Sequence, residues 1–419
     1  YATGDTVGIF QVSSDQMRDI FKRLQPKSLD QIVAIISLYR PGPLKYIDPY
    51  IERSKGKEYD LPSEKLKPIL EETYGIMVYQ EQIIQTLKLA GFSGGDADTI
   101  RRAISKKKIK EMAKYKDEFI AGMKKNFQMS EEESEKIWDD ILEFAGYGFN
   151  KSHASSYAEV SAKTAWLKKN YRLEYLLASM NCEIKHNDKV MVYVGDARKS
   201  GIKVLPADVN ASDALFKIEG KNIRYGLLAL KHVNQENIME LVAEREANGK
   251  FESIEDLLNR VKMNTSTFAA LLLAGAFDSL VLSGVENGTE VSPRYMAYSQ
   301  SPKKYKNSVR KMAGLDKDKD GKKLSVEEQE ERVPKSFAEW LKSEVSVVGE
   351  TYLTTHPIIL WLGGRKLSTV FNKKHPVVFA DFAMERIPVN GEGYILGIIR
   401  SVYHNIKKNW LFLTVGGFN

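Results

Sequence analysis

Apolar residues recur at three- and four-residue spacing from Thr3 to about Glu183, and this spacing constrains the fold more than any other feature of the sequence. Each such stretch places its apolar side chains on one face of an α-helix. Short glycine and proline segments interrupt the pattern and mark helix ends and turns. They lie at Arg40–Pro43, Gly75, Gly91, Gly94–Gly95 and Gly146–Gly148. The spacing predicts one large helical unit over residues 1–185.

The pattern changes after this unit. Short alternating segments at Lys203–Leu205, Phe216–Ile218 and Asn222–Arg224, with a turn at Gly220, predict a small β-structure with a hairpin. A compact helical module follows from Gly226 to Leu280. We therefore assign residues 186–283 to a second domain.

Residues 284–350 are poor in apolar side chains and rich in Gly, Ser, Asn, Lys and Asp, which predicts a flexible linker. A short helix is expected near its end, around Ser336 to Val348. From about Val377 onward, alternating apolar residues predict three strands of a small β-barrel within residues 351–419, which the sequence does not complete. The predicted fold class is multidomain and mainly α.

The chain has 419 residues, of which 43% are hydrophobic, and this is enough for two or three globular domains. Its longest apolar runs, such as Leu271–Ala276, are far shorter than the ~20 residues of a membrane span. A single cysteine, Cys182, cannot form an internal disulfide, which predicts a reducing, cytoplasmic location. Because the first residue is Tyr1, we expect a fragment, a processed product or a trimmed chain.

The net charge of +7 is concentrated in one segment. Between Arg101 and Lys125 there are ten basic and three acidic residues, whereas the other 394 residues carry 52 of each sign. This segment favours a polyanionic partner such as nucleic acid or a triphosphate. A solvated, lysine-rich helical face is the alternative.

Within that segment, Asp96 is the predicted start of a helix that carries Arg101–Arg102 in its second turn and Lys106–Lys107 a further turn along. The planar fork of arginine suits phosphate oxygens, so this arrangement predicts a triphosphate clamp. The alternative is a helix stabilised by i,i+4 pairs such as Asp98 with Arg102.

The most informative string is Phe144–Tyr157. Two glycines flank Tyr147, and an Asn-Lys-Ser-His turn precedes a helix that we expect to begin near Ser152. In this arrangement backbone N–H groups and Lys151 can face an anion, while Tyr147 offers a stacking surface. A lone histidine is more often structural than functional, but the company of a lysine, a serine and a tyrosine in one glycine-rich turn favours a functional His153.

Taken in order, five sequence blocks resemble the fingers of bacterial C-family replicative DNA polymerases, the polymerase III alpha family. The similarity continues through the second domain and resumes after the linker, so it covers almost the whole chain. The five blocks are Gly8–Gln11, Leu38–Pro43, Thr73–Gln82, Arg101–Lys107 and Gly146–His153, and the later matches are Ile223–Gly226, Phe251–Asp278 and Tyr352–Pro357.

The resemblance implies that the fingers hold the incoming deoxynucleoside triphosphate (dNTP). It implies that Arg101 and Arg102 bind the β- and γ-phosphates, and that Tyr147 stacks near the base or sugar. Ser152 and His153 would line the ribose, with His153 as a steric gate against a 2′-hydroxyl. The predicted DNA-binding residues are Arg40, Lys106, Lys107, Lys151, Lys231, Gly275 and Trp410.

Nucleotidyl transfer requires acidic residues that hold two Mg²⁺ ions, and no Asp-x-Asp pair lies on a predicted strand. The resemblance implies that Mg²⁺ belongs to a palm domain preceding the fingers. We therefore predict no catalytic or metal-binding residue in this chain and no polymerisation by the chain alone. Separately, Asp316, Asp318 and Asp320 resemble the start of an EF-hand loop and are candidate Ca²⁺ ligands, with a solvated linker as the alternative.

The module from Gly226 to Leu280 resembles the tandem helix-hairpin-helix region that grips duplex DNA in this family. The first turn has His232 and Asn234 where glycines are expected, which predicts a distorted turn and leaves open a module kept for packing only. The second turn keeps its glycine in Ala274–Ala276.

The last segment resembles the start of an OB-fold that handles single-stranded template, with Trp410 as a stacking residue. For a sliding-clamp peptide, Gln300 and Tyr305 are the only trace.

These features predict a part of a DNA-directed DNA polymerase III alpha subunit that acts in DNA replication. The expected partners are primer–template DNA, dNTP, a palm-containing polymerase portion, and a sliding clamp with other replisome proteins, without a membrane. The alternative is a noncatalytic DNA-binding protein derived from such a polymerase.

Overall fold

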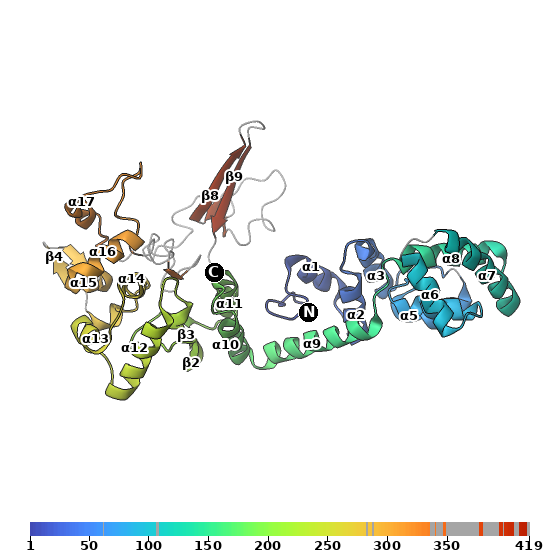
Figure 1. Cartoon of the computed structure of the whole chain (residues 1–419), viewed down its shortest axis with the longest axis horizontal. Helices are drawn as coiled ribbons and strands as arrows, with labels where there is room; N and C mark the ends of the chain where they lie inside the picture. The colour runs from blue at the N-terminus through green and yellow to red at the C-terminus, as the bar shows by residue number, and fades with distance from the viewer. Residues whose placement is uncertain are drawn as a thin grey trace. The chain divides into compact units, whose positions relative to one another are not determined.

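The computed structural model describes residues 1–61, 63–105, 109–281, 284–286, 289–335, 340 and 347–348, and the backbone of four strands between residues 377 and 416 (Figure 1). The chain divides into two compact units, Tyr1–Tyr171 and Arg172–Asn419, which we describe separately. The described residues are mainly helical, as the sequence predicted.

The described elements of the first unit are all helices. Its α-helices are α1 (Asp15–Leu24), α2 (Leu29–Leu38), α3 (Ile47–Ser54), α4 (Lys67–Leu70), α5 (Gln80–Leu89), α6 (Gly94–Ser105), α7 (Ile109–Phe127), α8 (Glu131–Ala145) and α9 (Lys151–Asn170), and its 3-10 turns are η1 (Pro43–Tyr46), η2 (Glu64–Leu66) and η3 (Glu71–Thr73).

Polar caps fix where these helices begin. The side chains of Ser14 and Ser28 accept hydrogen bonds from the N–H groups of Met17 and Gln31, which open α1 and α2. Ser130 and Glu133 form a reciprocal capping box at the start of α8. The caps satisfy N–H groups that a helix leaves without partners, so each capped helix starts at a defined residue.

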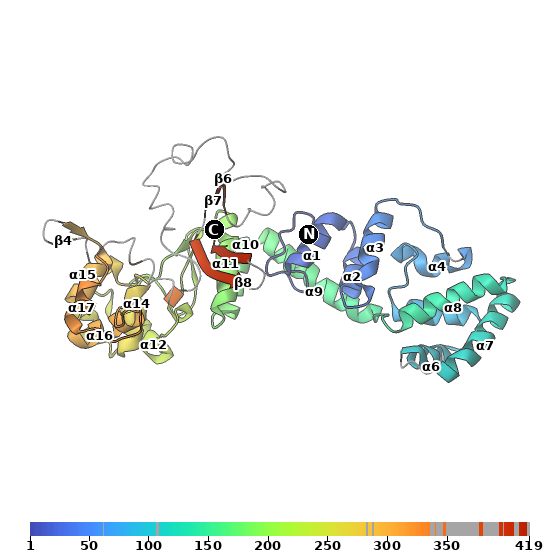
Figure 2. The same ribbon diagram turned by 90° about the horizontal axis from the view of Figure 1, so that it is seen from above.

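The apolar faces of these helices meet in one core. α2 packs along α9 (Figure 1), and α7 lies alongside α8 and next to α6 (Figure 2). Trp138 of α8 and Phe119 of α7 are fully buried, with ring centroids 5.4 Å apart. Gly122 permits the close approach of α7 to Ala90, because a Cβ at this position would lie 1.9 Å from the Ala90 carbonyl oxygen.

The second unit combines helices with a three-stranded sheet. Strand order in the sheet is β1-β3-β2, with β1 parallel and β2 antiparallel to β3, at the positions that the sequence predicted. Its elements are α10 (Arg172–Cys182), α11 (Asn187–Lys199), β1 (Val204–Leu205), β2 (Lys217–Glu219), β3 (Asn222–Arg224), η4 (Leu227–Ala229), α12 (Gln235–Asn248), α13 (Ile254–Arg260), α14 (Thr265–Leu273), η5 (Asp278–Leu280), the hairpin β4 (Gly284–Glu286) and β5 (Thr289–Val291), α15 (Pro293–Gln300), α16 (Lys303–Met312) and α17 (Val326–Glu331).

Residues 293–331 form helices where the sequence predicted a flexible linker. α16 packs against α14, and the side chains of Tyr298, Tyr305 and Val309 are buried in the same core as the helices before them. This segment has few apolar residues, but two of its arginines are buried and paired, Arg294 with Asp278 and Arg310 with Glu330. The polar composition of residues 293–331 therefore did not reveal that this segment is folded. Most of residues 336–350 lie outside the described part.

Tyr305 does not serve as an exposed clamp-peptide residue in this fold. Its ring is buried against Phe268, with centroids 4.4 Å apart, and its hydroxyl donates to the Met263 carbonyl at 3.0 Å. Gln300, at the end of α15, is exposed.

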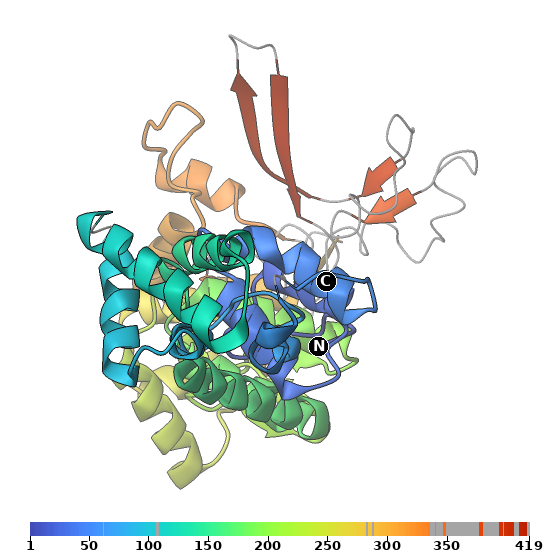
Figure 3. The same ribbon diagram turned by 90° about the vertical axis from the view of Figure 1, so that its right-hand side faces the viewer.

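Four strands are described near the C-terminus: β6 (Val377–Phe379), β7 (Tyr394–Leu396), β8 (Ile398–Asn405) and β9 (Trp410–Gly416). The sequence predicted three strands here, and the structure divides the middle one into β7 and β8. β6 pairs with β7 in parallel, and β8 pairs with β9 antiparallel (Figure 3). The residues between these pairs lie outside the described part, so the OB-fold stays a prediction.

Candidate nucleotide and DNA interface

The arginine pair predicted to bind triphosphate lies in α6. This helix begins after Ser93, whose hydroxyl accepts from the Asp96 N–H at 3.2 Å. Nε and Nη2 of Arg101 donate to Oδ1 of Asp98 at 3.0 and 2.8 Å, and Nη2 of Arg102 lies 2.7 Å from Oδ2 of the same residue. The hydrogen bond from Arg101 lowers the pKa of the Asp98 carboxyl, which therefore stays ionised at neutral pH. One carboxylate is thus shared by both arginines.

The two arginines differ in accessibility. The side chain of Arg101 is 13% exposed and that of Arg102 is 68% exposed. The i,i+4 pair that the sequence offered as an alternative to a phosphate clamp is therefore present, and it leaves Arg102 open to solvent. Arg101 is held in place, whereas Arg102 can reach a ligand.

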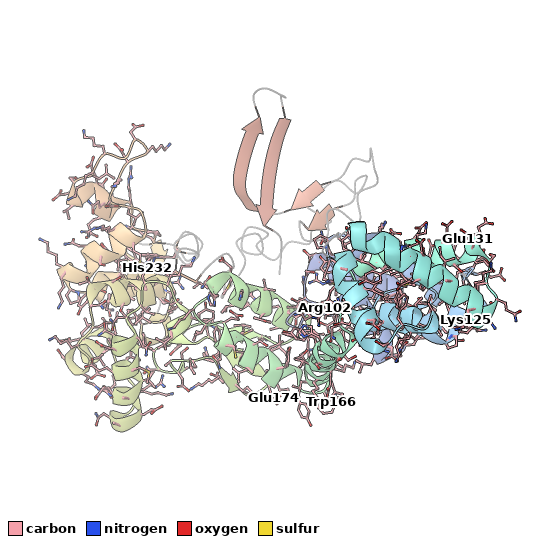
Figure 4. All side chains as sticks on the ribbon, turned by 45° about the vertical axis from the view of Figure 1, so that its right-hand side comes forward. Arg102, Lys125, Glu131, Trp166, Glu174 and His232 are labelled. Carbon is pink, nitrogen blue, oxygen red and sulfur yellow. The ribbon has the colours of Figure 1, made fainter. Side chains whose placement is uncertain are left out.

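Further positive charge of this segment lies along α7. Lys116 pairs with Glu135 of α8 at 2.8 Å, and Lys124 and Lys125 are exposed at the far end of the helix. Figure 4 shows Arg102 and Lys125 at opposite ends of the group of helices formed by α6, α7 and α8. Lys106 and Lys107, predicted to bind DNA, lie outside the described residues.

Tyr147 lies in the loop between α8 and α9, and its ring packs on the Pro41–Pro43 turn. Gly42 has φ +102°, and a Cβ there would lie 2.4 Å from Cε1 of Tyr147, so only glycine admits the ring. The residue is still 45% exposed. The loop therefore presents a supported but accessible aromatic ring.

Arg40, a predicted DNA-binding residue, also contacts this loop from within the protein. Its Nη2 donates to the Tyr147 carbonyl at 2.6 Å and its Nε to the Ser37 carbonyl at 3.0 Å. Its guanidinium lies 4.3 Å from the Phe149 ring centroid. Burial lowers the pKa of the Arg40 guanidinium. The group still remains charged, because the ordinary pKa of arginine is very high. Two of these contacts thus hold Arg40 against the Tyr147 loop, and the bond to Ser37 ties its side chain to α2.

A second anchor comes from the start of α5. The N–H of Gln80 donates to the Phe149 carbonyl at 2.9 Å, and the N–H of Phe149 donates to the Val78 carbonyl at 3.1 Å. The side-chain amide of Gln80 donates to the Gly148 carbonyl at 2.9 Å. Since α5 also packs against α6, one helix connects the loop to the element that carries the arginine pair.

The start of α9 is already occupied by acidic side chains. Asn150 caps the helix by accepting from the His153 N–H at 2.8 Å. Glu81 accepts from the Lys151 N–H at 3.0 Å, and Nζ of Lys151 pairs with Glu72 at 2.5 Å. Two acidic side chains of the protein thus contact Lys151 at this helix start. Sequence reasoning missed Glu72 and Glu81 because no spacing rule connects them to residue 151.

His153 and Ser152 are both exposed at the start of α9. The His153 ring lies between those of Phe149 and Tyr157, at centroid distances of 5.5 and 4.4 Å. The Tyr157 ring in turn lies 5.3 Å from that of Phe10. His153 thus belongs to a row of aromatic rings that limits its movement while leaving it accessible.

The first hairpin turn of the second unit adopts the glycine-like conformation despite its sequence. His232 has φ +67°, a region that non-glycine residues rarely enter. Its carbonyl accepts from the Ser266 hydroxyl at 3.2 Å, and the Asn234 N–H donates to the Thr267 hydroxyl at 2.8 Å. These bonds to α14 hold the turn, and Lys231 beside it is exposed.

The second turn does not offer its glycine to DNA. Gly275 has φ +78° and is buried, and its N–H donates to the Leu272 carbonyl at 3.0 Å. A Cβ there would lie 1.9 Å from Nη2 of Arg294, so the guanidinium covers the turn. The predicted phosphate contact of Gly275 is inconsistent with this burial, because α15 closes over the position.

Two further predictions concern the C-terminal strands and the acidic loop. Trp410 begins β9 and pairs with Asn405 through the backbone, and its side chain lies outside the described part.

In the acidic loop, Oδ1 of Asp318 accepts from the N–H groups of Asp320 and Lys322 at 3.0 and 2.8 Å. The described residues hold no group of three or more His, Cys, Asp or Glu side chains placed to bind a metal. A Ca²⁺-binding role for Asp316, Asp318 and Asp320 stays a prediction.

Two models of known protein families match this chain, one within each of its two units. Residues 1–127 match the bacterial DNA polymerase III alpha subunit finger domain, and residues 201–285 match a helix-hairpin-helix motif. The chain therefore joins a polymerase finger domain to a helix-hairpin-helix module. None of its described helices is long and apolar enough to cross a membrane.

Comparison with curated relatives identifies the family more closely. The DNA polymerase III subunit alpha of Caulobacter vibrioides is 37% identical over 95% of this chain. The corresponding proteins of Thermus aquaticus and Aquifex aeolicus are 42% and 43% identical, each over 66% of the chain. The chain belongs to the family of bacterial DNA polymerase III alpha subunits, which confirms the resemblance seen in the sequence. It spans 34%, 23% and 24% of the length of these three relatives.

Proposed function

We propose that the first unit binds the incoming dNTP for a replicative DNA polymerase. The observation that carries this proposal is the arginine pair of α6, which lies inside the matched finger domain and exposes the guanidinium of Arg102. Arg102 and Arg101 donate to the phosphate oxygens, where charge-assisted hydrogen bonds are strongest. Tyr147 stacks on the base or sugar, and Ser152 and His153 face the ribose, with His153 excluding a 2′-hydroxyl by its bulk.

We propose further that the second unit binds duplex DNA. The exposed Lys231 beside the His232 turn is the contact that the structure supports best, since hydrogen bonds to α14 hold the turn and it is open to solvent. Lys106, Lys107 and Trp410 stay in this proposal on the sequence resemblance alone. Gly275 leaves it because the residue is buried.

Mg²⁺ is the metal expected for nucleotidyl transfer in this family. The described residues provide no cluster of carboxylates that fits it, so we derive no step through a metal in this chain. We propose that a palm-containing portion supplies the metal site, that the chain alone does not extend primers, and that a clamp and other replisome proteins complete the assembly in the cytoplasm.

Nucleotide titration tests the central proposal. We expect calorimetry on the 419-residue chain to show dATP binding that Arg102→Ala weakens about ten-fold, the effect of losing a hydrogen bond between charged groups. The double variant Lys124→Ala/Lys125→Ala removes more charge from the same segment, and should bind dATP as the unaltered chain does. Equal loss in both variants would indicate nonspecific charge attraction. Binding of duplex DNA without any binding of dATP would support the noncatalytic alternative.

A further inference from the structure

The carboxylate of Asp98 contacts both arginines that the proposed function assigns to phosphate. Both of its oxygens are used: Oδ1 takes two hydrogen bonds from Arg101 and Oδ2 contacts Arg102. Two oxygens held by two guanidinium groups is also the way arginine recognises phosphate. The site therefore already contains an anion of its own.

The two halves of this arrangement are unequal. The side chain of Asp98 is 31% exposed and that of its partner Arg101 is 13% exposed, so the Asp98–Arg101 pair is the less accessible of the two. Its pair with Arg102 involves a side chain that is 68% exposed. Exposed i,i+4 pairs contribute little to stability, so an incoming anion can replace Asp98 at Arg102 at little cost. Arg101 keeps its partner during that exchange and maintains the position of the site.

Charge determines which anions gain from the exchange. Asp98 carries one negative charge against the two positive charges of the arginines. A ligand with a single dissociated phosphate oxygen only replaces what Asp98 already provides. A polyphosphate brings several charges and more acceptor oxygens, so it can engage Arg102 while Asp98 remains on Arg101.

We propose that Asp98 is a displaceable internal anion that makes the α6 arginine site selective for polyphosphates over single phosphate groups. This inference rests on the proposed nucleotide-binding function, which it deepens. Asp98 acts as a positioning and selectivity residue, since it touches the arginines and not the reacting atoms.

The test uses calorimetric titration of the full 419-residue chain with inorganic tripolyphosphate and with inorganic phosphate. The unaltered chain should bind tripolyphosphate more tightly than phosphate. In Asp98→Asn, which removes the charge but keeps the shape, we expect phosphate affinity to rise about three-fold, as exposed pair energies imply. The ratio of the two affinities should fall accordingly.

Asp96→Asn is the matched control, because it removes the same charge from the same helix while its carboxylate bonds Ser93. It should leave the ratio unchanged. Asp98→Ser removes the same carboxylate with a different side-chain volume, and should lower the ratio as Asp98→Asn does, which separates the effect from a folding defect of one variant.

An unchanged ratio in both Asp98 variants would overturn this inference while leaving the proposed function intact. An equal fall in Asp96→Asn would also overturn it, since the effect would then belong to the general charge of the helix. Absence of tripolyphosphate binding in every chain, the unaltered one included, would overturn the proposed function together with this inference.

Discussion

Arg40 could be selected from the sequence as a candidate functional residue, but its contacts in the fold could not be predicted. Two prolines flank Gly42 and mark a turn directly after Arg40. The sequence did not show that its partners are the Tyr147 carbonyl and the Phe149 ring, more than one hundred positions away. The same holds for Lys151, whose pair with Glu72 joins elements that no local pattern connects. Long-range pairing was the missing information.

At the residue scale, Arg40 should control the order of the Tyr147 loop. Replacing it with alanine removes two hydrogen bonds from a charged group, each worth about 1.5–3 kcal/mol. We expect Arg40→Ala to accelerate amide hydrogen exchange across residues 146–149 about ten-fold or more. Arg53→Ala removes a similar bond, from Arg53 to the Tyr74 carbonyl at 2.9 Å, and should leave these amides unchanged. Unaltered exchange in Arg40→Ala would contradict the anchoring role.

At the element scale, the acidic groups around the start of α9 should oppose DNA binding. Glu72 neutralises Lys151, so Glu72→Gln should release a positive charge toward a phosphate. We expect duplex DNA to bind about three-fold more tightly at low salt, and the slope of log affinity against log salt to steepen by about one. Fluorescence anisotropy over a salt series measures both quantities. Glu71→Gln removes a neighbouring exposed charge, and an equal effect there would show that Lys151 has no special part.

The link between η1 and α8 should depend on pH in the acid range. Glu143 of α8 bonds both Lys45 and Tyr46, and the hydrogen bond from Lys45 lowers the pKa of the Glu143 carboxyl from its ordinary 4.5. A carboxyl with a lowered pKa stabilises the folded state above its ordinary pKa and loses this contribution as pH falls below it.

Urea unfolding at pH 7 and at pH 3.5 measures this contribution. We expect Glu143→Gln to lower the free energy of unfolding at pH 7 by about 0.5–1 kcal/mol, the range for exposed pairs. The difference from the unaltered chain should shrink at pH 3.5. Asp139→Asn, an exposed carboxylate on the same helix, should show no such convergence. A difference that persists undiminished at pH 3.5 would mean that the carboxylate charge is not what stabilises the link.

At the scale of the whole molecule, helical periodicity was a reliable guide and composition was not. The spacing of apolar residues predicted a mainly α chain because amphipathic helices must bury one face. Composition failed at residues 293–331, since a segment whose arginines are buried and paired has the same polarity as a solvated linker. Gly275 was misjudged for the same reason: the sequence shows a turn glycine but not the arginine that covers it.

Arg294 should therefore be essential for attaching α15 to the helix-hairpin-helix module. Its side chain is fully buried, pairs with Asp278 at 3.0 Å and donates to the Leu273 carbonyl at 3.1 Å. Removing one partner of a buried ion pair leaves the other charge uncompensated and costs about 3–5 kcal/mol. We expect Arg294→Met to accelerate amide exchange in α14 and α16 while α2 and α9 exchange as before. Lys311→Met, an exposed position on α16, should alter neither region. If residues 293–331 were a linker, Arg294→Met would leave amide exchange unchanged, as Lys311→Met does.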